Sequence, residues 1–214
     1  MDFNAIVETE NHQISLPVLE EKNVKLFIKR EDLIHPFVSG NKFRKLKYNL
    51  HEAKKLKKKS LLTFGGAYSN HILATAVAGK IAGFKTFGII RGEELGKNIA
   101  ETLKDNDTLR EAHEHGMKFH FVTREIYRQK SSFGFIEKMK NKWGDFYLIP
   151  EGGTNFLAVD GCQEILTKED SKFDYICAAV GTGGTISGLI KSLKKHQKVI
   201  GFPALKGNFL SEEI

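Results

Sequence analysis

The stretch FDYICAAVGTGGTISGLIKSLKK, residues 173–195, decides the fold class. It begins with an apolar run, passes through a turn that contains three glycines, and continues with apolar residues at helical spacing. We expect a strand over 173–180 and a helix over 185–195. A strand that leads through a glycine-rich turn into a helix is typical of α/β proteins, in which helices cover a parallel sheet.

The rest of the chain repeats this alternation of strand and helix. Further strands are predicted over 24–29, 60–64, 85–90, 117–122, 146–149 and 199–202, and further helices over 41–58, 69–82, 99–116, 126–143 and 159–166. Parallel sheets of this kind bind ligands at the carboxyl ends of their strands. Two of those ends, 65–66 and 181–184, are rich in glycine, as expected of a ligand-facing loop.

Composition and charge narrow the possible partners. The chain has 214 residues, of which 41% are hydrophobic, enough for one large domain or two small ones. No apolar run approaches the roughly 20 residues that span a bilayer, so we expect no membrane partner. The lysine-rich run 54–59, which contributes to the net charge of +7, ends a predicted helix, where cations complement the helix dipole. It lacks interleaved aromatic residues, and we therefore expect no nucleic-acid partner.

The cysteines and the chain ends suggest further expectations. Cys162 and Cys177 form no Cys-x-x-Cys pair and are predicted to be reduced thiols in or near the core. Reduced thiols and an N-terminus without a secretion signal favour a cytoplasmic location. Ser211, followed by two acidic residues, predicts the start of a helix that a single turn cannot stabilise. We therefore expect the natural protein to continue beyond Ile214.

The first candidate site is the sequence Ser-Gly-Asn-Lys-Phe-Arg-Lys-Leu at 39–46. A Gly-Asn pair is a natural turn into a helix, with Asn41 as the predicted N-cap. Lys42 would then lie at a helix N-terminus, where positive charge is disfavoured, and a lowered pKa would leave the neutral amine that imine formation needs. A nearby phosphate would oppose that shift. Taken alone, such a lysine is more often an ordinary surface residue.

Two glycine-containing turns complete the candidate site. The segment 63–71 joins a strand to a helix, whose first backbone N–H groups can bind a carboxylate or a phosphate. Locally, Ser69 can equally be an N-cap and His71 a structural polar residue. The sequence Gly-Thr-Gly-Gly-Thr at 181–185 opens the next helix and resembles an anion cradle, although a purely structural turn is the alternative. It matches neither a Walker loop nor the dinucleotide fingerprint.

The order of these motifs resembles the 1-aminocyclopropane-1-carboxylate deaminase / D-cysteine desulfhydrase family. The similar stretches are Lys-Arg-Glu-Asp-Leu at 29–33, Gly-Asn-Lys-Phe-Arg-Lys-Leu at 40–46, Gly-Gly-Ala-Tyr-Ser-Asn-His at 65–71, Pro-Glu-Gly-Gly at 150–153 and Gly-Thr-Gly-Gly-Thr at 181–185. The resemblance runs nearly end to end. Deaminases of the family usually carry Ser-Asn-Gln, so His71 favours the desulfhydrase side.

The resemblance implies a two-domain α/β fold of the tryptophan synthase β-like type, PLP fold type II, with parallel twisted sheets covered by helices. Residues 1–46 and 154–214 would form the larger, cofactor-binding domain, incomplete at its C-terminus. Its sheet would begin near the N-terminus and resume after Asn155. Residues 47–153 would form the smaller domain, with pyridoxal 5'-phosphate between the two. Family members continue beyond this length with the partner of the pyridine nitrogen and a substrate-facing aromatic ring, and the family implies a homodimer.

The resemblance also implies roles for individual residues. Lys42 would hold the cofactor covalently and later move protons. Asn70 would bind the phenolic oxygen of the cofactor. The turn Ser69-Asn70-His71 would bind the carboxylate of a small amino-acid substrate, with Ser69 a candidate for proton transfer or nucleophilic attack. The residues expected to hold the cofactor phosphate are Gly181, Thr182, Gly183, Gly184 and Thr185.

The implied reaction is deamination or β-elimination of a small amino acid, which releases ammonia and a 2-oxo acid. Three alternatives stay open at this point. One is a different reaction on the same scaffold, such as dehydration or racemisation. The second is a homologue that binds pyridoxal phosphate without catalysis, as a carrier or regulator. The third is an α/β protein that binds a nucleotide or a nucleic acid.

Overall fold

The computed structural model describes residues 2–204. The strands are β1 (Asn11–Ile14), β2 (Leu26–Lys29), β3 (Ser60–Gly66), β4 (Lys85–Arg91), β5 (Lys118–Val122), β6 (Tyr147–Leu148), β7 (Tyr175–Val180) and β8 (Lys198–Pro203). The α-helices are α1 (Pro17–Glu21), α2 (Asn41–Lys55), α3 (Asn70–Ala82), α4 (Ile99–Asp105), α5 (Asp107–Glu114), α6 (Arg124–Arg128), α7 (Phe133–Trp143), α8 (Phe156–Gln163) and α9 (Gly184–Ser192). Short 3-10 helices are η1 (Glu31–Ile34), η2 (Glu93–Gly96), η3 (Glu151–Gly153) and η4 (Lys168–Lys172). The helix predicted to start at Ser211 lies outside the described residues.

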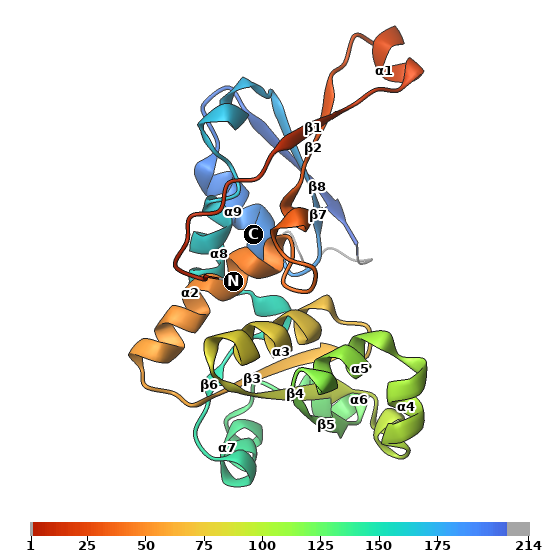
Figure 1. Cartoon of the computed structure of the whole chain (residues 1–214), viewed down its shortest axis with the longest axis vertical. Coiled ribbons are helices and arrows are strands. Elements are labelled where there is room, and N and C mark those ends of the chain that lie inside the picture. The colour runs from red at the N-terminus through yellow and green to blue at the C-terminus, as the bar shows by residue number, and fades with distance from the viewer. Residues whose placement is uncertain (1, 205–214) are drawn as a thin grey trace.

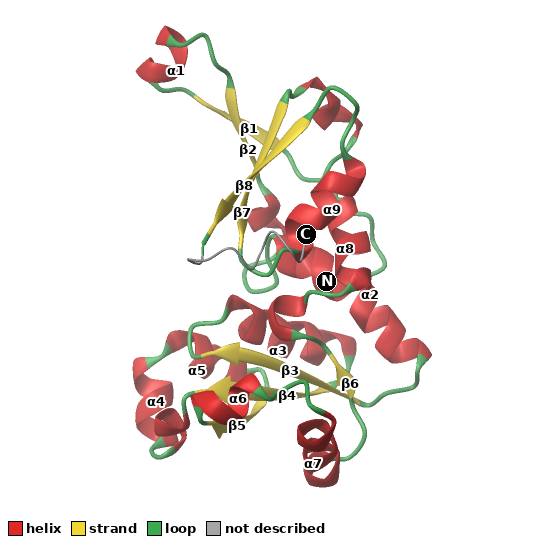
Figure 2. Ribbon diagram, turned by 180° about the vertical axis from the view of Figure 1, so that it is seen from behind, coloured by secondary structure: helices red, strands yellow, loops and turns green. Residues whose placement is uncertain are grey.

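The elements form two lobes, and helix α2 lies between them (Figures 1 and 2). One lobe contains the sheet β5-β4-β3-β6 with helices α3 to α7. The other contains β7 and β8 with α8 and α9, and the β1–β2 pair projects from it. This arrangement confirms the predicted α/β class. Within residues 2–204, no helix has both the length and the apolar composition needed to cross a membrane.

The four-stranded sheet is parallel throughout, and its central strands β3 and β4 are buried on both faces. On β3, Leu61 packs into the cluster that contains Leu46 and Leu50 of α2, whereas Leu62 and Phe64 pack on the opposite face. Because successive side chains of a strand alternate between faces, an unbroken apolar strand needs helices on both sides. Because β3 and β4 are parallel, their carboxyl ends lie at the same edge of the sheet, as predicted.

The second lobe has a parallel pair of strands, β7 and β8, that is covered on one face only. Cys162 of α8 and Leu189 of α9 pack there against Ile176. The other face carries apolar side chains that are open to solvent: Tyr175, Ile200 and Phe202. Cys177 is exposed as well, so the prediction that both cysteines lie in or near the core is wrong for Cys177 and confirmed for Cys162.

The N-terminal segment differs from the prediction. Strand β2 pairs antiparallel with β1, a strand that the sequence pattern did not reveal. Among the described strands, β2 makes no ladder with β7 or β8, and the expectation that the large sheet begins near the N-terminus stays a prediction. The pair is tied to the lobe through Asp170, which accepts hydrogen bonds from Asn11 Nδ2 at 2.8 Å and Lys29 Nζ at 2.9 Å.

Two of the long predicted helices are each divided by a capping residue. The predicted helix 99–116 is interrupted at Asn106, whose side chain accepts a hydrogen bond from the Leu109 N–H at 2.9 Å and so starts α5. The predicted helix 126–143 is interrupted before Ser132, which caps α7 in the same way. Side-chain oxygens at these positions satisfy backbone N–H groups that a new helix start leaves unpaired. Helical periodicity continued across both breaks, which is why the pattern alone did not show them.

Helix α2 is held by buried charges and by one very close helix contact. The Arg44 side chain is fully buried; its Nη2 lies 2.8 Å from Glu31 Oε1, and its Nη1 lies 3.6 Å from Glu164 Oε2. Helix α8 crosses α2 at Gly161, where a Cβ atom would come within 2.0 Å of the Arg44 carbonyl oxygen. These contacts determine how α2 is placed against the second lobe.

Candidate functional site

The start of α2 places Lys42 at the junction of the two lobes. Gly40 precedes the helix with φ of 58°, a conformation that favours glycine, and is the residue at the N-cap position. The prediction that Asn41 is the N-cap is therefore wrong by one residue. Phe43 and Leu46 are buried and anchor the helix, while Lys42 faces away from them and is half-buried. Burial lowers the pKa of the Lys42 amine below the usual range of lysine, although Cys162 opposes the shift.

The glycine-threonine turn after β7 lies opposite Lys42. A cavity of about 140 Å³ is lined by Asn41, Lys42, Lys45, Gly152, Gly181, Thr182, Gly183 and Thr185, together with residues at the end of β7 and the start of α9. The side-chain amide of Asn41 donates to Thr185 Oγ1 at 2.8 Å. The structure therefore brings Lys42 and the predicted phosphate loop to one cavity. Gly184, also predicted, is the first residue of α9 and does not itself line the cavity.

A second lysine, Lys45, also lines this cavity, and the sequence reasoning gave it no role. Its Nζ donates to Thr154 Oγ1 at 3.0 Å, to the Gly152 carbonyl at 3.3 Å and to Thr182 Oγ1 at 3.4 Å. Burial, and next the charge of Lys42, lower its pKa to about 8. The available signal was spacing: Lys45 follows Lys42 by three residues and so lies on the same helix face.

The charge and shape of the cavity suit an anion. Neither Lys42 nor Lys45 lies within ion-pair distance of a carboxylate in the described part of the chain. A Cβ atom on Gly184 would come 2.8 Å from Thr154 Cγ2 and 3.2 Å from Lys45 Nζ, so only glycine lets the loop backbone approach this closely. Backbone N–H groups at the start of α9 add positive potential. Two amines, hydroxyl donors and a glycine loop therefore fit the phosphate and aldehyde of pyridoxal phosphate.

The turn before α3 supplies Ser69 and Asn70 at the carboxyl edge of the four-stranded sheet. Ser69 is the N-cap of α3, and its Oγ accepts a hydrogen bond from the Ile72 N–H at 3.4 Å. Asn70 is exposed, and its amide makes no side-chain hydrogen bond to residues 2–204. Neither residue lines the cavity around Lys42. The N-cap alternative for Ser69 is confirmed, and the catalytic role of Ser69 and the cofactor role of Asn70 stay predictions.

His71 is buried rather than facing the cavity. Its Nε2 lies 2.8 Å from Thr63 Oγ1, and that hydroxyl lies 2.9 Å from the Ile149 carbonyl. Because a carbonyl only accepts, the hydroxyl donates to Ile149 and His71 Nε2 donates to the hydroxyl. Burial lowers the pKa of His71 to about 3, with the charges of Lys42 and Lys45 adding to the effect. The imidazole is therefore neutral near neutral pH, and the role of His71 in binding a substrate carboxylate stays a prediction.

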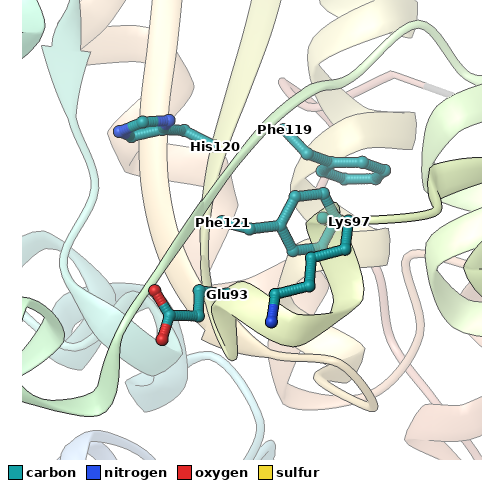
Figure 3. A pocket seen from close by; sticks show the side chains of 6 residues that line it. Glu93, Lys97, Phe119, His120 and Phe121 are labelled. Carbon is teal, nitrogen blue, oxygen red and sulfur yellow. The ribbon is translucent and has the colours of Figure 1, made fainter.

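A larger depression of about 400 Å³ lies elsewhere, along the outer strand β5 (Figure 3). It is lined by Glu93 and Gly96 of η2, by Lys97, and by Phe119, His120 and Phe121 of β5. It contains none of the predicted site residues and opens broadly to solvent. No cluster of three or more His, Cys, Asp or Glu side chains that could hold a metal ion occurs within residues 2–204.

Comparison with known proteins identifies the family to which the chain is similar. The family described as "Pyridoxal-phosphate dependent enzyme" matches residues 8–209. A Thermotoga maritima protein named "Putative 1-aminocyclopropane-1-carboxylate deaminase" is 36% identical over 194 residues, which cover 85% of this chain and 59% of that protein. The Arabidopsis thaliana protein "Bifunctional D-cysteine desulfhydrase/1-aminocyclopropane-1-carboxylate deaminase, mitochondrial" is 32% identical over 198 residues, which cover 86% of this chain and 49% of that protein.

Solved structures show the same likeness. A crystal structure described as an "ACC deaminase homologue" matches with a TM-score of 0.74 at 28% identity, covering 96% of this chain and 63% of that one. A pyridoxal 5'-phosphate-dependent aspartate racemase matches in fold, with a TM-score of 0.68 at 18% identity. The chain spans about half to three-fifths of the length of the curated relatives that it matches.

Proposed function

The chain belongs to the family of pyridoxal-phosphate dependent enzymes, and from this premise we propose that it is the part of a deaminase or desulfhydrase that holds the cofactor. The proposed reaction converts a small amino acid and water into a 2-oxo acid and ammonia, with hydrogen sulfide as a further product when the substrate is cysteine. One observation supports this above the others: the Lys42 amine and the loop 181–185 line the same cavity.

Individual residues of the chain would have separate roles in holding the cofactor and moving protons. Lys42 Nζ would bond the cofactor aldehyde, for which a lowered pKa is favourable because only the neutral amine is a nucleophile. Thr182, Thr185 and the loop backbone would hold the phosphate, with Lys45 as the opposing cation. When bound, pyridoxal phosphate supplies an electron sink for charge at the substrate α-carbon. Lys42 Nζ would then carry a proton to or from that carbon.

The turn before α3 would orient the substrate. Asn70 and His71 open α3, and their backbone N–H groups, as donors of the first helical turn, would suit a carboxylate. Asn70, which is exposed beside them, would bind the phenolic oxygen of the cofactor, and Ser69 would be close enough to the substrate to move a proton. These roles come from the family resemblance. His71 would take part in this turn through its backbone N–H, since its imidazole is buried.

The wider organisation follows from the same proposal. Residues 1–46 and 154–214 would belong to the larger domain and 47–153 to the smaller, with the cofactor between them. A homodimer and a cytoplasmic location complete the proposal. Light scattering of the purified protein and fractionation of cells that express it test these two points directly.

The decisive experiment is a cofactor titration followed by visible absorption. We expect the protein to shift the spectrum of added pyridoxal phosphate and Lys42→Ala to abolish that shift. Lys55→Ala is the matched control, because Lys55 lies on the same helix with its side chain 76% exposed. An unchanged spectrum in Lys42→Ala would reject Lys42 as the anchor. Turnover of D-cysteine, 1-aminocyclopropane-1-carboxylate and serine by the protein would separate the proposed reaction from a dehydratase or a racemase.

A further inference from the structure

The turn η3, between β6 and α8, borders the cavity through the backbone of Gly152. Gly152 and Gly153 have φ of 67° and 73°, the left-handed region that favours glycine. A Cβ atom on Gly152 would come 2.8 Å from Thr182 Cγ2 and Oγ1, and the Gly152 carbonyl accepts from Lys45 Nζ at 3.3 Å. The position of this turn therefore determines where both Lys45 and Thr182 can lie.

Two glycines have no side chains with which to hold a position, so the turn is held at its ends. On one side Thr154 Oγ1 lies 3.0 Å from Lys45 Nζ and 2.5 Å from Thr182 Oγ1, and both of these partners line the cavity. On the other side the carboxylate of Glu151 points away from the cavity. Its Oε1 accepts a hydrogen bond from the Tyr127 hydroxyl at 2.7 Å, and its Oε2 lies 3.2 Å from Lys130 Nζ.

Tyr127 is a rigid anchor for this contact. Its side chain is 4% exposed and its ring meets Phe64 of β3 edge to face, with 6.5 Å between the ring centroids. The cationic groups of Lys130 and Arg91 lie 4.8 Å and 5.7 Å from the centre of the ring. Burial, and next the bond to Glu151, raise the pKa of the Tyr127 hydroxyl. The hydroxyl therefore stays protonated and donates to the Glu151 carboxylate.

We propose that Tyr127 and Glu151 are positioning residues for the cofactor phosphate, acting through Gly152 on Lys45 and Thr182. The inference rests on the proposed function, since it assigns the cavity to that phosphate. In this arrangement Tyr127, from the lobe that contains the four-stranded sheet, sets the geometry of the loop 181–185, which belongs to the other lobe. The Tyr127–Glu151 hydrogen bond is the contact that holds the turn in position. The Lys130–Glu151 ion pair is not needed for this, because it is partly exposed.

The test compares variants of the same protein by two readouts. The first is the affinity for pyridoxal phosphate, with inorganic phosphate as competitor. The second is hydrogen exchange of the backbone over 150–155 and 181–186 without cofactor. We expect Tyr127→Phe to weaken cofactor affinity about tenfold, the effect of losing one hydrogen bond to a carboxylate, and to speed exchange in both segments. Glu151→Ala should behave likewise, while Glu151→Gln, which keeps an acceptor, should retain most of the affinity.

Matched controls separate positioning from general loss of stability. Thr102→Val removes another hydroxyl hydrogen bond of 2.7 Å, to the Leu95 carbonyl, in the same lobe. It should lower the melting temperature comparably and leave affinity and local exchange unchanged, as should Lys130→Met for affinity. The inference is overturned if Tyr127→Phe leaves exchange over 150–155 and 181–186 at the parent rate, or if Thr102→Val reproduces its effects. If the parent protein binds no cofactor, the proposed function fails, and the exchange data still decide whether the turn depends on Tyr127.

Discussion

The side-chain amide of Asn41 donates a hydrogen bond of 2.8 Å to the hydroxyl of Thr185, and this contact joins the first turn of α2 to the first turn of α9. Lys42 follows Asn41 directly, and the glycine-threonine loop precedes Thr185 directly. The contact therefore couples the amine and the loop that together line the cavity. Both partners are polar and half-buried, so the pair is specific in geometry and modest in energy.

A double-mutant cycle tests this coupling. We expect Asn41→Ala and Thr185→Val each to lower the free energy of unfolding by about 1 kcal/mol, and the double variant to lose little more than either. Urea denaturation measures all three. Asn41→Ala combined with Thr102→Val serves as the control, since those sites share no partner and their effects should add. Additive losses for Asn41 and Thr185 would show that the contact contributes nothing.

Lys45 makes anion binding dependent on pH. Its pKa is lowered to about 8 by burial and by the charge of Lys42, and only the protonated amine attracts a phosphate. Affinity for inorganic phosphate should therefore be full below pH 8 and fall above it, by about tenfold per unit of pH. Calorimetric titrations from pH 7.5 to 9.5 measure this. Lys45→Met should bind weakly at every pH, Lys55→Met should behave as the parent, and a flat parent profile would contradict the assignment.

His71 should make the folded state sensitive to acid. Its pKa of about 3 in the folded protein lies below the ordinary value of 6.5, so the unfolded chain takes up a proton that the folded chain refuses as the pH falls. Stability should decline below pH 6.5, with a contribution from His71 of about 2 kcal/mol at pH 5. His71→Gln, whose amide can still donate to Thr63, should show a shallower decline in denaturation experiments. His12→Gln, an exposed control, should follow the parent; equal slopes for all three would reject the burial argument.

The crossing of α2 and α8 makes Gly161 intolerant of substitution. A Cβ atom there would meet the Arg44 carbonyl oxygen at 2.0 Å, and backbone atoms cannot move aside without separating the helices. We expect Gly161→Ala to lower the free energy of unfolding by about 3 kcal/mol. Gly134→Ala in α7, where nothing lies within 4 Å of the added atom, should raise it by about 0.5 kcal/mol. Chemical denaturation of both variants decides the matter, and equal effects would be inconsistent with the close crossing.

Local sequence patterns predicted part of the fold and part of the candidate site. Apolar runs in β3 and β4, and glycines such as Gly83 at the end of α3, produce local patterns, so the parallel sheet and most helices were predicted. The motif around Lys42 and the loop 181–185 were found because each is a contiguous sequence. Lys45 and Thr154 were missed, since their importance arises from contacts between segments about 110 residues apart. The alternative that His71 is a structural polar residue agrees with its buried contact with Thr63, although the further contact of Thr63 with Ile149 joins segments that no local pattern relates.

The projecting β1–β2 arm has a practical consequence. Its tip, α1, contains no buried residue, and the chain from Lys22 to Lys25 is exposed throughout. Trypsin should cut there first, since proteases prefer accessible segments that open without disturbing a core. Because Asn11 and Lys29 both hold Asp170, the two fragments should stay associated. A nicked protein would run as one species on a sizing column and as two bands on a denaturing gel, which would make the arm a convenient place to insert a tag.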